Sequence, residues 1–140
     1  MKFIPYSKPD ITNKEVSEVL KTLKSGWITT GPNCDLFEND FKKYLNTKRH
    51  CISVSSNTAG LHLSLESFGI GENDEVITTV HTFTATASVI TFLKAKPVFV
   101  DIDPETYCID PEQIKKSITK NTKAIIVVHF GGYPCNMNEI

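Results

Sequence analysis

The sequence lacks the patterns that mark metal-binding and redox proteins. Among its four cysteines, no two are separated by two residues, which excludes CxxC zinc-knuckle and redox motifs. Its four histidines show no HExxH or other ligand spacing. We therefore expect no metal site, and we expect free thiols at all four cysteines. These cysteines are Cys34, Cys51, Cys108 and Cys135.

Long apolar runs and blocks of charge are missing too. No apolar stretch approaches the length of about 20 residues that a membrane-spanning helix needs. The N-terminal stretch contains Pro5 and Pro9 and no apolar signal-peptide core, so the sequence predicts a cytoplasmic protein. The formal net charge is −1 with no basic block, which gives no reason to expect nucleic acid or a membrane as a partner.

The glycine motifs of nucleotide-binding folds are also absent. The only Gly-x-Gly pair, Gly69 and Gly71, lies between a helical pattern and a strand pattern and lacks the third glycine. A dinucleotide fingerprint needs the reverse order, strand before helix. The sequence has no phosphate-loop motif with a glycine-lysine pair and no nucleophile elbow. We therefore reject a dinucleotide-binding fold.

What the sequence contains is an alternation of short apolar runs and helical patterns. The expected strands are residues 51–54, 75–79, 97–102 and 124–130. The expected helices are residues 59–68, 82–95 and 110–118, with a further helix beginning at residues 136–140. Apolar strands spaced by helices are typical of a parallel sheet covered on both faces. The sequence thus predicts an α/β fold.

Two helices are expected before this alternation. Thr12 and Glu15 form a capping-box pattern at the start of the first, which ends at Ser25 and Gly26. A loop at residues 27–32 carries the only tryptophan and leads to a second helix at residues 34–45. Helical periodicity predicts a stripe on the first helix (Val16, Val19, Leu20, Leu23) and a buried side on the second (Leu36, Phe37, Phe41, Tyr44).

Ligands of open α/β sheets bind beyond the carboxyl ends of the strands, and residues 55–60 follow the first expected strand. This stretch (SSNTAG) turns directly into a helix, so its backbone N–H groups and small side chains predict a cup for a phosphate. The alternative is an ordinary helix N-cap, because Ser, Asn and Thr are favoured capping residues.

Aromatic side chains follow the next strand. Phe83 or His81 could stack on a planar ring, although a core role for Phe83 is the alternative. A phosphate cup beside an aromatic ring suits a phosphorylated heteroaromatic cofactor, either pyridoxal phosphate or a nucleotide. Asp101 and Asp103 follow the third strand, as a carboxylate pair or, more simply, as turn residues before Pro104.

Several stretches match one family in chain order. The sequence resembles the N-terminal part of the DegT/StrS-type sugar aminotransferases, which use pyridoxal phosphate and have the type I aminotransferase fold. The pattern is most similar to members that aminate the 4-keto group of a UDP-linked sugar. The matching stretches are residues 25–32, 54–62, 69–78, 82–86, 99–104 and 122–129.

The resemblance implies an incomplete large domain of that fold. Residues 1–33 would form the N-terminal helix and active-site loop, and residues 34–140 the alternating α/β part, with the rest of the domain and a small C-terminal domain absent. Ser56, Asn57 and Thr58 would hold the cofactor phosphate, and Phe83 would stack on the pyridine ring. Tyr6, Trp27, Thr29 and Thr30 would contact substrate, either in the same subunit or in a neighbouring subunit of a homodimer, while His129 would be structural.

The resemblance also implies a reaction. The full enzyme would transfer an amino group, with glutamate as donor, to a nucleotide-linked keto sugar. The family's Schiff-base lysine and the aspartate that pairs with the pyridine nitrogen both lie downstream of residue 140. None of Lys94, Lys96 and Lys123 has the catalytic context, so we expect this chain to be inactive alone. The alternatives are a sugar dehydratase of the same family, which lacks the lysine, and a non-catalytic module that binds a ligand or a longer partner.

Overall fold

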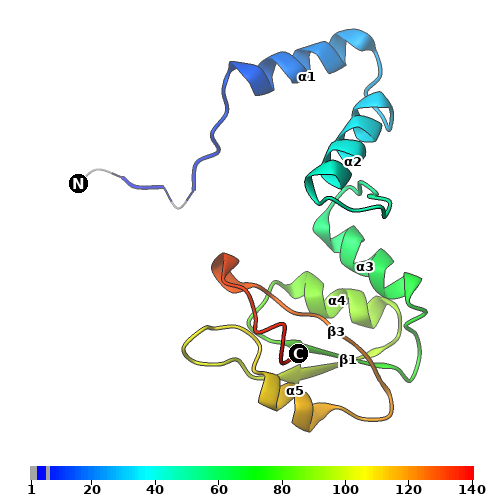
Figure 1. The fold of residues 1–140 in the computed structure, drawn as a ribbon, viewed down its shortest axis with the longest axis vertical. Coiled ribbons are helices and arrows are strands. Elements are labelled where there is room, and N and C mark those ends of the chain that lie inside the picture. Colours follow the sequence, from blue (N-terminus) through cyan, green and yellow to red (C-terminus); the bar gives the residue numbers. More distant parts are fainter. Residues whose placement is uncertain (1–2, 6) are drawn as a thin grey trace. The chain divides into compact units, whose positions relative to one another are not determined.

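The computed structural model describes residues 3–5 and 7–140, and the chain divides into two units between Ser53 and Val54. The first unit contains two helices, α1 (Asn13–Ser25) and α2 (Pro32–Tyr44). The second contains α3 (Asn57–Ser67), β1 (Glu75–Thr79), α4 (Thr84–Phe92), β2 (Lys96–Val100), α5 (Pro111–Ser117), β3 (Thr122–Ile125) and the 3₁₀ turn η1 (Phe130–Gly132) (Figure 1).

The ends of α1 form as the sequence predicts. The Thr12 side chain accepts a hydrogen bond from the backbone N–H of Lys14, and the Glu15 carboxylate accepts one from the backbone N–H of Thr12 at 2.6 Å. The bonds from Thr12 hold the pKa of Glu15 below its ordinary value, because they favour the carboxylate form. Gly26 ends the helix with φ +73°, a conformation that glycine adopts without a steric penalty.

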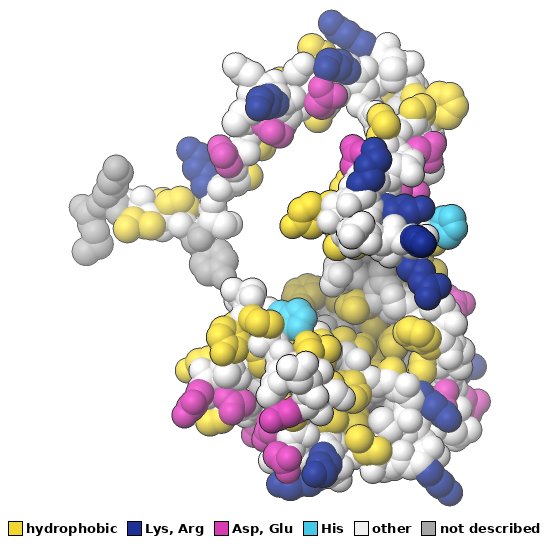
Figure 2. Space-filling view, viewed as in Figure 1, with side chains coloured by type: hydrophobic (Ala, Val, Ile, Leu, Met, Phe, Trp, Pro, Cys, Tyr) yellow, Lys and Arg dark blue, Asp and Glu magenta, His cyan; other side chains and the backbone are white. Residues whose placement is uncertain are grey.

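The apolar faces of these two helices are exposed, which corrects the buried side expected for the second. Neither α1 nor α2 contains a buried residue. Phe37 is 61% exposed and Tyr44 84%, and their rings stack along α2 through Phe41. Figure 2 shows hydrophobic side chains at the surface along both helices, among lysines and carboxylates. The physical reason is that the described residues of the first unit form no sheet against which this side could pack.

The second unit is built on a parallel sheet. In the described part of the chain, the sheet has three strands in the order β2-β1-β3. Ile77 of the central strand pairs with Val98 of β2 and Ile125 of β3. All five residues of β1 are buried, as expected of a central strand with both faces covered.

Two hydrophobic clusters cover the two faces of this sheet, with α4 on one side and α5 on the other (Figure 1). Val76 of β1 faces the cluster formed with α3 and α4, which includes Leu65 and Ile90. The next residue, Ile77, faces the cluster formed with α5, which includes Ile114. This alternation follows from the two-residue period of a strand. The predicted α/β fold, with a parallel sheet and helices on both faces, is confirmed.

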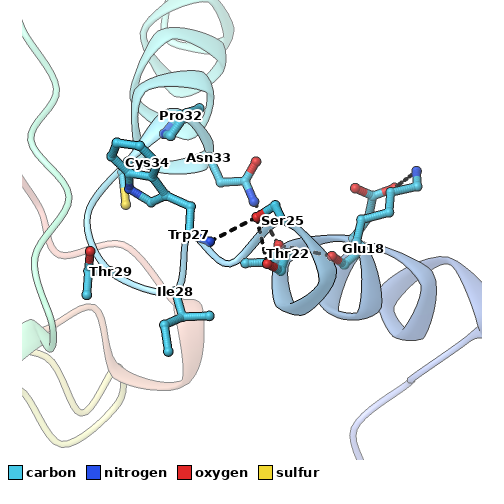
Figure 3. A pocket seen from close by; sticks show the side chains of 11 residues that line it. Glu18, Thr22, Ser25, Trp27, Ile28, Thr29, Pro32, Asn33 and Cys34 are labelled. Atoms are coloured by element: carbon cyan, nitrogen blue, oxygen red, sulfur yellow. Dashed lines mark hydrogen bonds and ion pairs between the residues drawn. The ribbon is translucent and has the colours of Figure 1, made fainter.

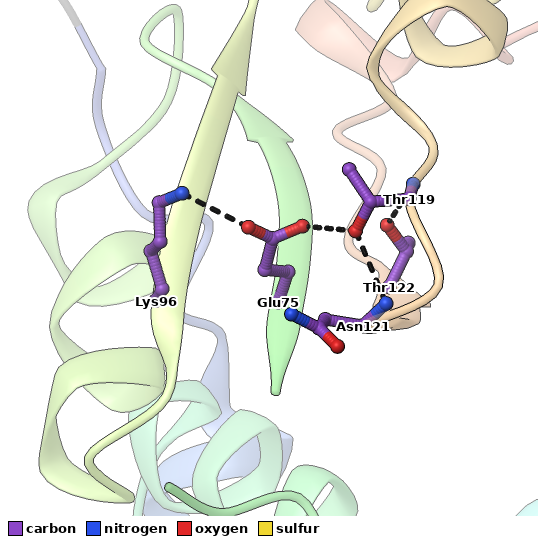
Figure 4. Close-up of polar contacts among 5 residues, drawn as sticks. All are labelled: Glu75, Lys96, Thr119, Asn121 and Thr122. Atoms are coloured by element: carbon purple, nitrogen blue, oxygen red, sulfur yellow. Dashed lines mark hydrogen bonds and ion pairs between the residues drawn. The ribbon is translucent and has the colours of Figure 1, made fainter. Parts of the chain in front are cut away.

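Glu75 anchors the amino edge of the sheet (Figure 4). Glu75 is only 8% exposed, and its carboxylate accepts hydrogen bonds from Thr119 Oγ1 at 2.6 Å and Lys96 Nζ at 2.9 Å. Its backbone N–H donates to the carbonyl of Asn121 at 2.8 Å. These contacts tie the first residue of β1 to the start of β2 and to the turn before β3.

Two predicted strands differ from the structure. Residues 51–54 form no strand, because the backbone N–H and hydroxyl of Ser53 donate to the Glu38 carboxylate of α2 rather than to a neighbouring strand. The strand predicted at residues 124–130 is shorter in the structure and begins earlier, at Thr122–Ile125. Directly after it, the backbone N–H of Ile126 donates to the carbonyl of Ile77 in β1. The helix expected to begin at residues 136–140 is a turn closed by hydrogen bonds to the Asn136 carbonyl.

Candidate functional site

The predicted phosphate cup forms the N-terminus of α3. Ser56 is the N-cap, and its hydroxyl accepts a hydrogen bond from the backbone N–H of Ala59 at 3.1 Å. The ordinary capping role is therefore real. Capping uses one backbone N–H group of the first turn and leaves other N–H groups of that turn without a partner inside the helix. Capping and anion binding are therefore compatible in this stretch.

Two of those remaining donors belong to Asn57 and Thr58. Within residues 3–5 and 7–140, no acceptor takes a hydrogen bond from either backbone N–H. Asn57 is exposed and Thr58 half-buried, so both N–H groups sit at the surface of the helix start. The free N–H groups and the helix dipole give this position a partial positive charge that favours an anion.

The start of α4 lies at the same edge of the sheet as the start of α3, which is the carboxyl edge. The chain leaves α3, turns at residues 69–74 and enters β1, so the N-terminus of α3 points away from the amino edge. The end of β1 leads into α4, whose N-cap is Phe83. Phe83 is 78% exposed, which argues against a core role for its ring within this unit. Its assignment to a cofactor ring stays a prediction.

Asp103 opens a turn, whereas Asp101 lies directly after β2. Asp103 Oδ1 accepts hydrogen bonds from the backbone N–H groups of Thr106 and Glu105, at 2.8 and 2.9 Å. The bond from Thr106 is the main cause that holds the pKa of Asp103 below its ordinary value. Asp101 Oδ1 accepts from the backbone N–H of Ile102, so each carboxylate bonds to backbone N–H groups close to it in the sequence. The structure thus supports the turn interpretation for Asp103.

The residues proposed for substrate contact lie in the first unit, apart from Tyr6, which falls outside the described residues. The indole Nε1 of Trp27 donates to the Thr30 carbonyl at 2.8 Å, and the Trp27 backbone N–H donates to Ser25 Oγ. Beside the indole is an open pocket of about 520 Å³ that Thr29 also lines (Figure 3). The role of these residues in binding substrate stays a prediction.

The lysines of the second unit gather at the amino edge of its sheet. Lys94 lies between α4 and β2, and Lys96, the first residue of β2, pairs with Glu75. The others flank the end of α5 and the start of β3 and are Lys115, Lys116, Lys120 and Lys123. Each strand spans about 3.3 Å per residue, so the sheet separates these amines from its carboxyl edge. No lysine of this unit is placed to react beside the start of α3 or α4.

His129 has a structural contact, as the resemblance implied. Its Nδ1 accepts a hydrogen bond from the backbone N–H of Cys135 at 3.0 Å. In the part of the chain that the structure describes, no three His, Cys, Asp or Glu residues are grouped to hold a metal ion. None of the helices described there is long and apolar enough to span a membrane.

Comparison with known proteins identifies the family. The model of the DegT/DnrJ/EryC1/StrS aminotransferase family matches residues 9–140. The chain belongs to this family. The family assignment agrees with the resemblance seen in the sequence.

Two curated relatives show how much of a family member is present. An uncharacterised protein of Methanocaldococcus jannaschii is 54% identical over 138 residues. The spore coat polysaccharide biosynthesis protein SpsC of Bacillus subtilis is 46% identical over 138 residues. Each alignment covers 99% of this chain, but only 36% and 35% of the respective relative. The chain thus spans about a third of the length of these DegT/DnrJ/EryC1/StrS proteins.

Solved family structures share the fold. A proposed sugar aminotransferase of Streptococcus pneumoniae, Spr1654, in its PLP form has a TM-score of 0.92 at 43% identity, covering 97% of this chain and 34% of that one. NtdA of Bacillus subtilis, with bound cofactor PMP, has a TM-score of 0.85 at 39% identity, covering 93% of this chain and 31% of that one.

Sequence reasoning missed one feature of the carboxyl edge. It considered His81 as a candidate for stacking but not the rings of Tyr107 and Phe130, which lie against it. These three residues are far apart in the sequence and follow three different strands. The shared position after successive parallel strands was the only available signal.

Proposed function

We propose that this chain forms the phosphate-binding part of a pyridoxal-phosphate-dependent sugar aminotransferase. The complete enzyme transfers an amino group from glutamate to a nucleotide-linked keto sugar and works as a homodimer in the cytoplasm. The family assignment supports the aminotransferase class, and the PLP and PMP forms of similar structures support the cofactor. The observation that carries the proposal is the pair of free N–H groups at the start of α3.

The residues present fit the cofactor. The N–H groups of Asn57 and Thr58, together with the Thr58 hydroxyl, would bind the phosphate, while Ser56 keeps the helix start in shape by capping it. The exposed ring of Phe83 would cover one face of the pyridine ring and exclude water. When bound, pyridoxal phosphate supplies the electron-withdrawing ring on which amino-group transfer depends.

The proposal also requires a lysine from outside the second unit, and the family resemblance implies that this lysine lies downstream of residue 140. The six lysines of the second unit lie at the amino edge, where Lys96 is paired with Glu75. Proton transfer and covalent attachment at the carboxyl edge therefore need an amine that residues 54–140 do not offer there. We expect the intact mass of the natural gene product to exceed the 15.6 kDa of these 140 residues. A mass equal to 15.6 kDa would contradict this requirement.

The cofactor assignment is tested with Thr58→Val in the complete natural gene product. We expect its Kd for pyridoxal phosphate to rise about tenfold or more, because a hydrogen bond to a charged group contributes about 1.5–3 kcal/mol. The matched control is Thr91→Val at the far end of α4, which removes a hydroxyl bonded to the Ser88 carbonyl. An unchanged Kd in Thr58→Val would contradict the cup.

Loss of the helix cap must be separated from loss of the cup. Ser56→Ala removes the side chain that caps α3, and Asp110→Ala removes the equivalent cap of α5, which accepts from Glu112 at 2.9 Å. Each substitution should cost about 0.5–2 kcal/mol of stability. Only Ser56→Ala should weaken binding of pyridoxal phosphate, measured by absorbance titration. Equal weakening in both variants would mean that stability, rather than the site, controls binding.

The substrates are tested by chemistry. With pyridoxal phosphate, glutamate and a UDP-linked 4-keto sugar, the complete gene product should release 2-oxoglutarate in proportion to amino sugar. Dehydration of the sugar without amino transfer would favour the lysine-lacking dehydratase instead. Binding of the cofactor without either reaction would favour the non-catalytic module.

A further inference from the structure

Three rings meet at the carboxyl edge of the sheet. His81 follows β1, Tyr107 follows β2 and Phe130 follows β3. The ring centroids of His81 and Phe130 are 4.2 Å apart, and Tyr107 lies 6.0 Å from each of them. We call His81, Tyr107 and Phe130 the three-ring cluster. It joins the loops after all three strands into one packed group.

His81 is also fixed by hydrogen bonds. Its Nδ1 lies 3.2 Å from the backbone carbonyl oxygen of Tyr107. A carbonyl oxygen can only accept, so Nδ1 carries the proton and donates. The backbone N–H of His81 donates to Thr79 Oγ1 at 3.2 Å. The imidazole is thus held on one side by a ring contact and on another by the backbone of the loop after β2.

The loop after β2 takes a conformation that needs support. Tyr107 has φ +58°, which is uncommon for a residue with a side chain. Such a conformation persists where surrounding contacts determine it. The contacts of His81 with the ring and the backbone carbonyl of Tyr107 contribute to that support.

Phe83 is two residues beyond His81, on the same short connection between β1 and α4. Its ring is exposed, so its own packing does not set its direction within this unit. The connection is held on its other side by Thr82, whose Oγ1 lies 2.8 Å from Thr86 Oγ1 in the first turn of α4. The placement of Phe83 therefore depends on how residues 80–82 are fixed.

We propose that His81 is a positioning residue that locks the connection at residues 80–83 onto the loops after β2 and β3 and so sets the direction of Phe83. The imidazole does this with two separable contacts, the ring contact with Phe130 and the hydrogen bond to the Tyr107 carbonyl. Its consequence for the cofactor rests on the proposed function, in which Phe83 covers the pyridine ring.

The variants separate the two contacts. His81→Phe keeps a ring against Phe130 but removes the Nδ1 donor, and His81→Asn keeps an N–H donor but removes the ring. His81→Ala removes both. The matched control is His62→Ala, because His62 also contacts an aromatic ring, that of Phe92 at 6.0 Å, but this pair joins α3 to the end of α4 and is not part of the three-ring cluster.

The first measurement needs no cofactor. Hydrogen exchange of the backbone amides of residues 80–83 is followed in the cofactor-free complete gene product. We expect exchange to be about two- to tenfold faster in His81→Ala, the range that loss of one aromatic pair produces, and to be partly restored in His81→Phe and His81→Asn. Unchanged exchange in His81→Ala, or equal acceleration at these amides in His62→Ala, overturns the inference.

The second measurement reads the direction of Phe83 through the cofactor. After loading with pyridoxal phosphate, His81→Ala should lose circular dichroism in the absorption band of the bound cofactor, and kcat should fall more than the KM for glutamate changes. An unchanged dichroism signal overturns the link from His81 to Phe83. Failure of the unsubstituted protein to bind pyridoxal phosphate contradicts the proposed function, while the exchange measurement still decides whether His81 locks the connection.

Discussion

Gly31 leaves the space that the indole ring of Trp27 occupies. A Cβ at this position would overlap the ring, whose Nε1 is hydrogen-bonded to the Thr30 carbonyl. The φ of Gly31 is −174°, an extended value open to any residue, so the requirement for glycine is steric rather than conformational. A single absent methyl group thus determines where the only tryptophan of the chain lies.

This steric requirement gives a prediction for Gly31→Ala. We expect the indole to be displaced, at a cost of about 1–3 kcal/mol typical of overpacking, with a shift of tryptophan fluorescence toward that of free tryptophan. Because Trp27 is the only tryptophan, the emission reports this site alone. Gly71→Ala is the control, since nothing lies within 4 Å of its added Cβ. Identical spectra for both variants would contradict the packing of Trp27 against Gly31.

The four cysteines should differ in reactivity. Cys108 and Cys135 are only 3% and 4% exposed, while Cys34 and Cys51 are half-buried. Burial is the main cause that raises the pKa of the Cys135 thiol, and the neighbouring Cys108 thiol adds to it. We expect two thiols to react with a chromogenic disulfide reagent about tenfold or more faster than the other two, because burial limits access to both Cys108 and Cys135 and the raised pKa of Cys135 lowers its thiolate fraction further. Four equal rates in the folded chain would contradict this, and four equal rates are expected after denaturation.

At the scale of an element, α3 begins at the proposed phosphate cup and continues as a regular helix. Gly60 is in its first turns, and an added Cβ would lie 3.6 Å from Val54 Cγ2, an ordinary van der Waals distance. We expect Gly60→Ala to stabilise the second unit by about 1 kcal/mol, since alanine has the higher helix propensity. Gly69→Ala should do the opposite, because Gly69 follows the helix with φ +71°. Chemical denaturation of both variants checks the two signs, and equal signs would contradict this account.

Helices were predictable because each carries its own signals. The Thr12 capping box, the proline at the start of α5 and the glycine after α1 mark helix ends through local chemistry. Strands were harder, because a strand exists only where a neighbour pairs with it. Residues 51–54 have strand composition, yet Ser53 bonds to the Glu38 side chain instead. The residues around Ser53 in the sequence do not show that it will bond to a side chain 15 residues away.

The candidate site divides in the same way. The start of α3 and Phe83 could be predicted because each directly follows an apolar run and begins a helix. The three-ring cluster could not, because its members come from loops that only the sheet order β2-β1-β3 brings together. The predicted buried side of α2 was wrong because periodicity shows which side of a helix is apolar but not whether anything covers it.

At the scale of the whole second unit, the two edges of the sheet have different tasks. The carboxyl edge carries the free N–H groups, Phe83 and the three-ring cluster. The amino edge carries the lysines and the contacts of Glu75, which join three parts of the sheet. We therefore expect stability contributed at the amino edge to be independent of the groups that we propose to bind the cofactor at the carboxyl edge.

This separation predicts a specific pH dependence. The hydrogen bond from Thr119, and then that from Lys96, hold the pKa of Glu75 below the ordinary carboxyl value of 4.5, because they favour the ionised form. A lowered native pKa means that the stabilisation is complete above 4.5 and is lost as the pH falls toward the native pKa. The protection of the β1 amides from hydrogen exchange, corrected for the intrinsic exchange rate at each pH, should therefore decrease through this acidic range in the unsubstituted chain.

Glu75→Gln removes the titrating group while keeping its size. At neutral pH its β1 amides should exchange faster than those of the unsubstituted chain, because the charge-assisted bonds to Thr119 and Lys96 are weakened. The difference should shrink as the pH falls below 4.5 toward the lower native pKa of Glu75, at which Glu75 itself becomes protonated in the folded chain. Glu72→Gln, in the exposed turn before β1, is the control for a general loss of negative charge. A difference between Glu75→Gln and the unsubstituted chain that stays constant across the acidic range would mean that the ionisation of Glu75 is not what stabilises the sheet.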